Sequence, residues 1–138
     1  MSDREQLENT IREFYRARDK GDIDAMMALF DPACRFRIAG SDKLGSITQQ
    51  VDGQAALREA VTTLVDTWDL SNVRITSLHV DGDTVFVHRT GEIRFIPSGE
   101  VTPTELLDKL TFRNGLVVDY LEFVDTLLVA DTIGLFDT

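Results

Sequence analysis

The sequence has little cysteine, histidine and positive charge, and it contains no long apolar run. Its 138 residues include one cysteine, Cys34, so an internal disulfide cannot form. Fourteen Lys and Arg residues against 24 Asp and Glu residues give a net charge of -10, which would repel nucleic-acid phosphates and an anionic membrane surface. No segment reads as an export signal or a membrane span. We therefore expect one cytoplasmic domain over residues 1–138 that binds neither nucleic acid nor membrane.

The two histidines do not form a metal site in the predicted arrangement. His79 and His88 lie on different predicted strands, and Glu92 would be about 13 Å from His88 at the usual rise per residue of a strand. The sequence also has no phosphate-binding loop, dinucleotide fingerprint or nucleophile elbow. We expect no metal and no cofactor.

The first half of the chain has helical periodicity. Residues 3–20 place apolar side chains at helical spacing, and Gly21 ends this helix. Asp22 is a predicted N-cap for a short second helix that closes at Asp31-Pro32, and a third helix starts near Asp52. The polar segment 41–50 between the second and third helices is predicted to be a loop, with room for a brief strand.

The second half has the period of two that is typical of strands. After a strand in 34–40, further strands are expected at 73–80, 84–96, 104–113 and 116–125, and a short helix that Asp125-Thr126 can cap closes the chain through Ile133. Turn residues such as Asn114-Gly115 separate the later strands, which indicates an antiparallel meander. Helices first and a curved antiparallel sheet after them predict an α+β fold in which the helices cover one sheet face.

Ionisable residues occur on apolar strand faces. Asp108 alternates with Leu110, Arg89 shares a face with apolar neighbours on an earlier strand, and Glu122 shares the parity of Tyr120. A buried carboxylate must be paired, hydrogen-bonded or neutralised, so these residues form either a structural ion-pair network or a site. A β-bulge would turn His88 inward in place of Arg89, and both orientations stay open at this point.

Three segments carry a resemblance to a known family. The runs EFYRARDKGDIDAMMALFDPACRFRIAG, DGQAALREAV and FRNGLVVDYLEFVDT resemble the nuclear-transport-factor-2-like superfamily, and within it the SnoaL-like and ketosteroid-isomerase-like proteins. The resemblance covers nearly the whole chain. It implies a cystatin-like cone, in which a strongly curved, mixed sheet wraps around the N-terminal helices and encloses a pocket. Members include isomerases, cyclases, hydrolases and proteins without catalysis.

The ketosteroid isomerase pattern transfers in part. Asp108 falls where those enzymes keep a protonated acid that donates to the substrate oxyanion. Phe14 occupies the position of their oxyanion tyrosine, with Tyr15 beside it, and Ile38 occupies the position of their general base. Since Ile38 cannot take a proton, steroid isomerisation by that mechanism is not expected.

Limonene epoxide hydrolases give a second partial match. Glu122 in LEFVD matches an acid on their final strand, and those enzymes pair two acids through an arginine, for which Arg89 is the candidate. The second acid and the water-orienting residues of that family have no counterpart here.

Together these patterns predict a pocket for a small hydrophobic molecule, with acid/base chemistry of the isomerase, cyclase or hydrolase type. The expected catalytic residues are Asp108, Glu122 and Arg89. The expected substrate-binding residues are Phe14, Tyr15, Phe36, Ile38, Trp68, Leu110 and Tyr120. The alternative is a non-catalytic binding protein for an apolar ligand, with structural buried acids. A homodimer through the outer sheet face is also expected, because Leu107, Leu121 and Phe123 are available there.

Overall fold

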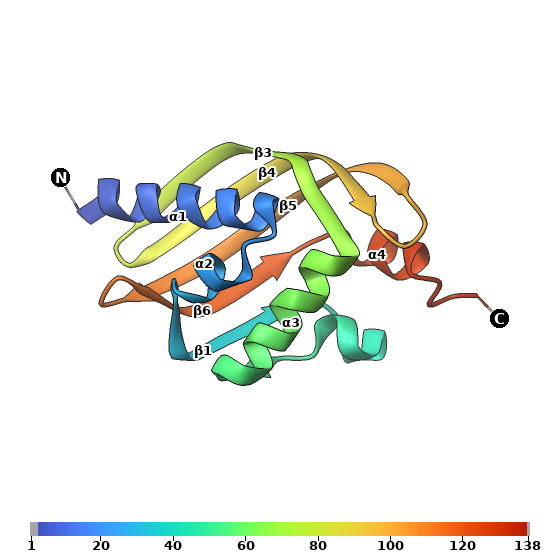
Figure 1. The fold of residues 1–138 in the computed structure, drawn as a ribbon, viewed down its shortest axis with the longest axis horizontal. Helices are drawn as coiled ribbons and strands as arrows, with labels where there is room; N and C mark the ends of the chain where they lie inside the picture. Colours follow the sequence, from blue (N-terminus) through green and yellow to red (C-terminus); the bar gives the residue numbers. More distant parts are fainter. Residues whose placement is uncertain (1–2, 138) are drawn as a thin grey trace.

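The computed structural model describes residues 3–137. In chain order the elements are α1 (Asp3–Lys20), α2 (Ile23–Met27), β1 (Phe30–Ile38), the 3₁₀ segment η1 (Asp42–Thr48), β2 (Val51–Asp52), α3 (Gln54–Thr67), β3 (Trp68–Asp81), β4 (Thr84–Phe95), β5 (Glu100–Arg113), β6 (Leu116–Phe123) and α4 (Thr126–Thr132). Figure 1 shows α1 and α3 lying across the sheet. Within the described residues, no helix is long and apolar enough to cross a membrane.

The helix boundaries follow local capping chemistry. Gly21 takes a left-handed conformation with φ 70°, which ends α1 without a steric penalty. The carboxylate of Asp22 accepts a hydrogen bond from the Ala25 amide at 3.1 Å and so caps α2. Asp125 does the same for α4 through the Leu128 amide at 3.0 Å. The predicted first helix and both aspartate caps are confirmed.

Several strands begin earlier than their apolar alternation predicts. β1 begins at Phe30 and includes Asp31-Pro32, which was expected to close the second helix. The pairing of β1 with β6 is irregular between Phe30 and Arg35, and such an irregularity accommodates a proline that has no N–H to donate. β3 begins at Trp68, directly after α3, instead of near residue 73. Segment 41–50 holds the 3₁₀ segment η1, where a loop was predicted.

The sheet has six strands in the order β2-β1-β6-β5-β4-β3. β3 to β6 form the predicted antiparallel meander, while β1 joins it in parallel beside β6. At the turn into β6, Asn114 and Gly115 both have positive φ, 53° and 79°, as a type I′ hairpin turn requires. The sheet is therefore mixed, and its parallel pair consists of β1 and β6, the strand that carries Glu122.

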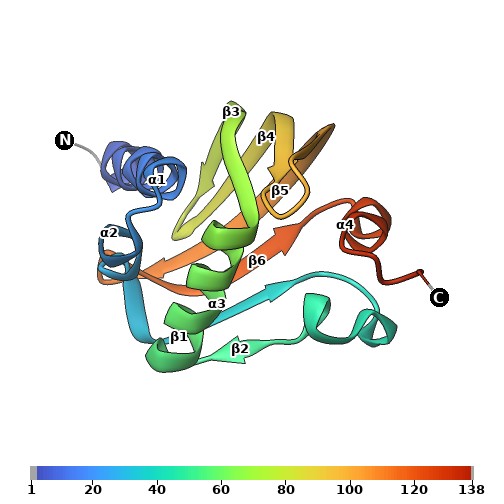
Figure 2. The same cartoon turned by 45° about the vertical axis from the view of Figure 1, so that its right-hand side comes forward.

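The sheet curves around the helices, as Figure 2 shows for α3. α1 packs on β3 and α3 packs on β1, so the inner faces of the strands form the core. The predicted inward residues of β5, namely Leu106, Asp108, Leu110 and Phe112, are all buried. The α+β fold with one covered sheet face is confirmed.

Candidate functional site

A polar network lies inside the core, on side chains from one helix and three adjacent strands. Asp108 of β5 is the direct cross-strand partner of Glu122 on β6 and of Val87 on β4. Arg89 lies two residues beyond Val87 and therefore on the same sheet face. Its side chain is 3% exposed, while Asp108 is 0% and Glu122 9% exposed. Strand register thus brings three ionisable groups together in the interior.

Asp108 is the hub of this network. Its Oδ2 atom accepts a hydrogen bond from Arg89 Nη2 at 2.9 Å, one from the Tyr120 hydroxyl at 3.1 Å, and a short one from the Tyr15 hydroxyl. Three donors converging on one oxygen is the pattern expected of an ionised carboxylate. Among the described residues, its other oxygen, Oδ1, has no partner.

Glu122 occupies the other side of the same cluster. Its Oε2 atom lies 3.3 Å from Arg89 Nη2 and 3.3 Å from the Tyr120 hydroxyl. Burial raises the pKa of Glu122 well above its ordinary value, the charge of Asp108 raises it further, and Arg89 opposes both. The two carboxyls therefore share one arginine, and Glu122 is the one whose burial favours the protonated form.

Tyr120 bridges the two carboxyls in a way that is compatible with a protonated Glu122. A phenol carries one proton, so its hydroxyl donates to one neighbour and is free to accept from another. The Tyr120 hydroxyl lies within donating distance of both carboxyls, and when Glu122 is protonated it can donate to Asp108 and accept from Glu122. Burial and the charge of Asp108 raise the pKa of both Tyr15 and Tyr120 well above 10, so both phenols stay neutral.

Arg89 is held as a cation by these partners. Burial is the largest single effect and lowers its pKa, but Asp108, Tyr15, Tyr120 and Glu122 together raise it by more, so the net shift is upward. Its guanidinium carbon also lies 4.3 Å from the centre of the Tyr15 ring, within the range of a cation–π contact. Within the described part of the chain, its Nε has no hydrogen-bond partner.

A cavity of about 750 Å³ adjoins the network. The predicted site residues on its wall are Phe14, Tyr15, Phe36, Ile38, Trp68, Arg89, Tyr120 and Glu122. Its remaining wall comes mainly from α3, η1 and α4. Two predicted site residues, Asp108 and Leu110, are fully buried behind the cavity wall. Glu122 is therefore the carboxyl of the network that faces the cavity, and Asp108 acts on the cavity only through its neighbours.

Sequence reasoning missed four charged residues of the wall: the exposed acids Asp52, Glu59 and Asp125, and Arg18 of α1, which is the one cation among them. Its Nη2 donates to the backbone carbonyls of Trp68 at 2.8 Å and Leu64 at 3.3 Å. The signal was present, since Arg18 continues the helical spacing of Phe14 and Tyr15. An arginine on an apolar helix face is usually explained by its long stem, so the pattern did not single it out.

The inner orientation belongs to Arg89 and not to His88. The His88 ring lies on the opposite face, where Nε2 is 2.9 Å from Glu105 Oε2 and Nδ1 is 2.7 Å from the Thr76 hydroxyl. The sheet does contain a register shift near this position, between Ile75 and Ser77, but it falls on β3. The alternation of β4 is therefore kept, with Arg89 inward.

The SnoaL-like domain family matches residues 11–120. Since this match covers most of the chain, the chain belongs to that family. The predicted resemblance is thus confirmed. No curated protein gives a significant match to the chain.

Solved structures show the same fold. A candidate isomerase from Bacillus subtilis is 21% identical with a TM-score of 0.83, covering 97% of this chain and 96% of its own. A nuclear-transport-factor-2-like protein of unknown function from Burkholderia pseudomallei K96243 is 17% identical with a TM-score of 0.78, covering 95% and 97%. A candidate SnoaL-like polyketide cyclase from Jannaschia sp. CCS1 is 20% identical with a TM-score of 0.76, covering 93% and 91%. At these identities the likeness concerns the fold alone.

Proposed function

We propose that this protein carries out acid/base chemistry of the isomerase, cyclase or hydrolase type on a small hydrophobic molecule bound in the cavity. One observation carries the proposal: the buried carboxyl of Glu122, with its raised pKa, lies on the wall of a cavity of about 750 Å³. This volume falls within the usual range of small-molecule sites. A buried acid that keeps its proton near neutral pH is a suitable general acid.

Each residue of the network has a role in this proposal. Glu122 donates its proton to a substrate oxygen, and the carboxylate that remains is stabilised by Arg89, 3.3 Å away. In an isomerisation the same carboxylate then takes a proton from substrate carbon, so the enzyme returns to its starting state. Asp108 is a positioning residue, since it touches no cavity space and holds Tyr15, Tyr120 and Arg89 in place.

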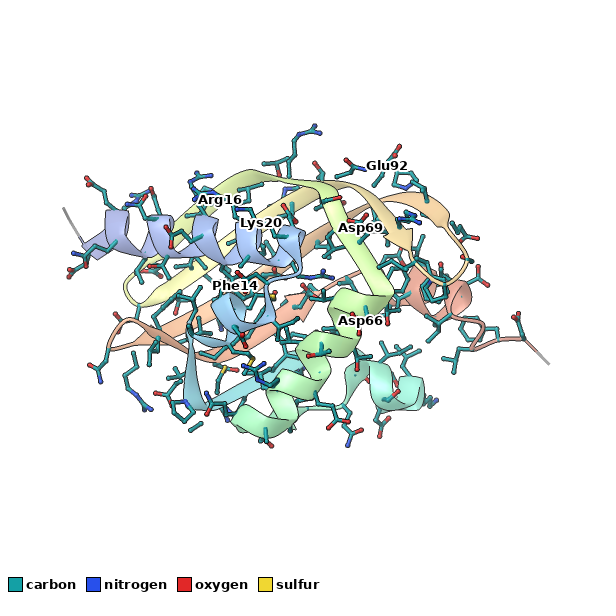
Figure 3. The ribbon with its side chains drawn as sticks, viewed as in Figure 1. Phe14, Arg16, Lys20, Asp66, Asp69 and Glu92 are labelled. Atoms are coloured by element: carbon teal, nitrogen blue, oxygen red, sulfur yellow. The ribbon has the colours of Figure 1, made fainter. Side chains whose placement is uncertain are left out.

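The test is turnover by a Glu122→Gln variant on a panel of apolar epoxides and enolisable ketones. The amide keeps the size and a hydrogen-bond donor of the protonated acid but has no transferable acidic proton. We expect turnover to fall about 100-fold or more, the usual contribution of a general acid, with little change in ligand binding. Glu92→Gln is the matched control, because Glu92 is exposed on β4 (Figure 3). Unchanged turnover in Glu122→Gln would refute the catalytic role.

A second candidate function is binding without catalysis, and one observation favours it. Asp108, the best-connected acid, is fully buried and accepts three hydrogen bonds on one oxygen, as a structural ion pair would. Under this proposal the protein retains an apolar ligand through purification and converts no member of the panel. A cavity that is stabilised by no apolar compound would count against it.

We further propose a homodimer through the outer sheet face. Leu107 and Phe123 are cross-strand partners on that face, and they are 38% and 45% exposed. Adjacent exposed apolar side chains of this size mark a surface that a second copy can cover. Light scattering should give twice the chain mass, and Phe123→Asp should give the monomer mass. A monomeric mass for the unchanged protein would contradict the proposal.

A further inference from the structure

We propose that the cavity ligand carries an oxyanion on its apolar body, a carboxylate being the simplest case, and that Arg18 pairs with it. This inference rests on the proposed function and deepens it by naming the substrate class. It starts from the hydrogen-bond partners of Arg18 and from the charge balance at the polar end of the cavity.

Arg18 is a cation on the cavity wall whose partners are neutral. The hydrogen bonds of its guanidinium go to the carbonyls of Leu64 and Trp68, both from Nη2. Over residues 3–137 no carboxylate lies within 4.0 Å of it. Burial lowers the pKa of Arg18, which is the effect expected for a cation that has lost water.

The neighbouring carboxyls do not neutralise this charge. Asp108 is paired with Arg89, and burial favours the neutral form of Glu122, in which these three residues together carry no net charge. The C-terminal end of α3, which supplies the Leu64 carbonyl, offers Arg18 only about half a negative charge. One unit of positive charge is therefore incompletely balanced at the polar end of the cavity.

The other acidic residues near Arg18 or on the cavity wall are engaged or exposed. Asp69, at the start of β3, lies 3.9 Å from Arg94, and Figure 3 shows it above Asp66 of α3. Asp19 follows Arg18 on α1 and is exposed. The cavity wall also includes three exposed acids, Asp52, Glu59 and Asp125. Exposed carboxylates are screened by solvent, so they balance a partly buried cation poorly.

Arginine suits the recognition of a planar oxyanion. Its guanidinium presents five donors in a rigid fork that matches a carboxylate, and Nη2 of Arg18 is already fixed by two carbonyls. The same cavity wall also has apolar residues, including Phe14, Leu70 and Ile93. A ligand with one anionic group and an apolar body would satisfy both parts of this surface.

The experiment compares two probes of nearly the same size and shape, the anionic 2-naphthoate and the neutral 2-naphthamide, by titration calorimetry at pH 7. We expect the unchanged protein to bind the naphthoate at least tenfold more tightly than the naphthamide. Arg18→Gln should bring the two dissociation constants to within twofold of each other, and Arg18→Lys should keep part of the preference. Arg12→Gln is the control, because Arg12 is exposed on the same helix. The ratio within one variant is the readout, so a loss of stability alone cannot produce the expected result.

Three results would overturn the inference: equal binding of the probes by the unchanged protein, a preference that survives Arg18→Gln, or binding of neither probe. The proposed function is tested separately by turnover of uncharged epoxides and ketones in Glu122→Gln. If that turnover depends on Glu122 while the charge preference is absent, only the present inference fails. If neither probe binds and no substrate of the panel is converted, both fail.

Discussion

Replacing Glu122 by Gln should remove a pH dependence of stability that the buried proton creates. Burial and Asp108 raise the pKa of Glu122 in the folded protein, whereas in the unfolded chain it titrates near 4.3. Between those two pKa values the folded state holds one proton that the unfolded state has released. Stability from this group is therefore full below the unfolded pKa and is lost as the pH rises toward the folded pKa.

The size of the effect follows from that single proton. In this window the free energy of unfolding falls by about 1.4 kcal/mol for each pH unit, or about 2.7 kcal/mol from pH 5 to pH 7 if the window spans both. The glutamine side chain of the variant resembles the protonated acid and does not titrate. The two proteins should therefore be close in stability at pH 5, and the variant should become the more stable one as the pH rises.

Urea unfolding at several pH values from 5 to 8 measures this difference. Titrations of the other residues occur in both proteins and largely cancel in the comparison, and Glu92→Gln supplies the control for an exposed carboxylate. A difference between Glu122→Gln and the unchanged protein that is flat from pH 5 to pH 8 would refute the reasoning. It would mean that the network holds no extra proton and that Glu122 is ionised throughout.

Three other substitutions or treatments test the surrounding structure. Arg89→Met leaves Asp108 buried without its cation and should cost about 3–5 kcal/mol in urea unfolding; a cost below about 1 kcal/mol would contradict the buried pair. Cys34 has its pKa raised to about 12 by burial, so a thiol reagent should label it only as fast as the protein opens, and rapid labelling of the folded state would argue against that burial. Gly91→Ala should cost about 3 kcal/mol or more, because its Cβ would lie 2.1 Å from the Asn72 carbonyl oxygen; a stable variant would show that β3 and β4 are not in close contact there.

Much of the sheet and the inner residues of its strands could be predicted from the sequence. Alternation on β5 correctly placed Asp108 inward, and alternation on β4 did the same for Arg89, because a one-residue slip would have exposed the apolar neighbours of each. Asp22 and Asp125 marked helix starts because an N-cap is a local hydrogen bond that needs no tertiary context. These features depend on short-range patterns, which one sequence contains in full.

The remaining features depend on distances between elements, which periodicity does not specify. The early start of β1 at Phe30 comes from its pairing with β6, and Asp31-Pro32 locally favours a break instead. The sequence also could not predict that Asp108 lies deeper in the core than Glu122, since alternation turns both side chains toward the inner face of the sheet. Which of the two lies deeper depends on the position of α1, whose Tyr15 contacts Asp108. The role of Arg18 depends on the end of α3, about fifty residues further along the chain.

The buried acid at position 108 connects the fold to the proposed chemistry without itself reaching a ligand. Its charge is one of the causes that raise the pKa of Glu122, second after burial, and Tyr120 links the two carboxyls. Replacing Asp108 by an uncharged residue would therefore lower the pKa of Glu122 and leave Arg89 free to stabilise the ionised form. The Asp108–Arg89 ion pair would therefore serve both the fold and the proposed chemistry. It stabilises the core, and the charge of Asp108 favours the protonated form of Glu122. The cavity-facing acid depends on a second, sealed acid, and the register of β5 with β6, which pairs Asp108 with Glu122, holds the two side by side.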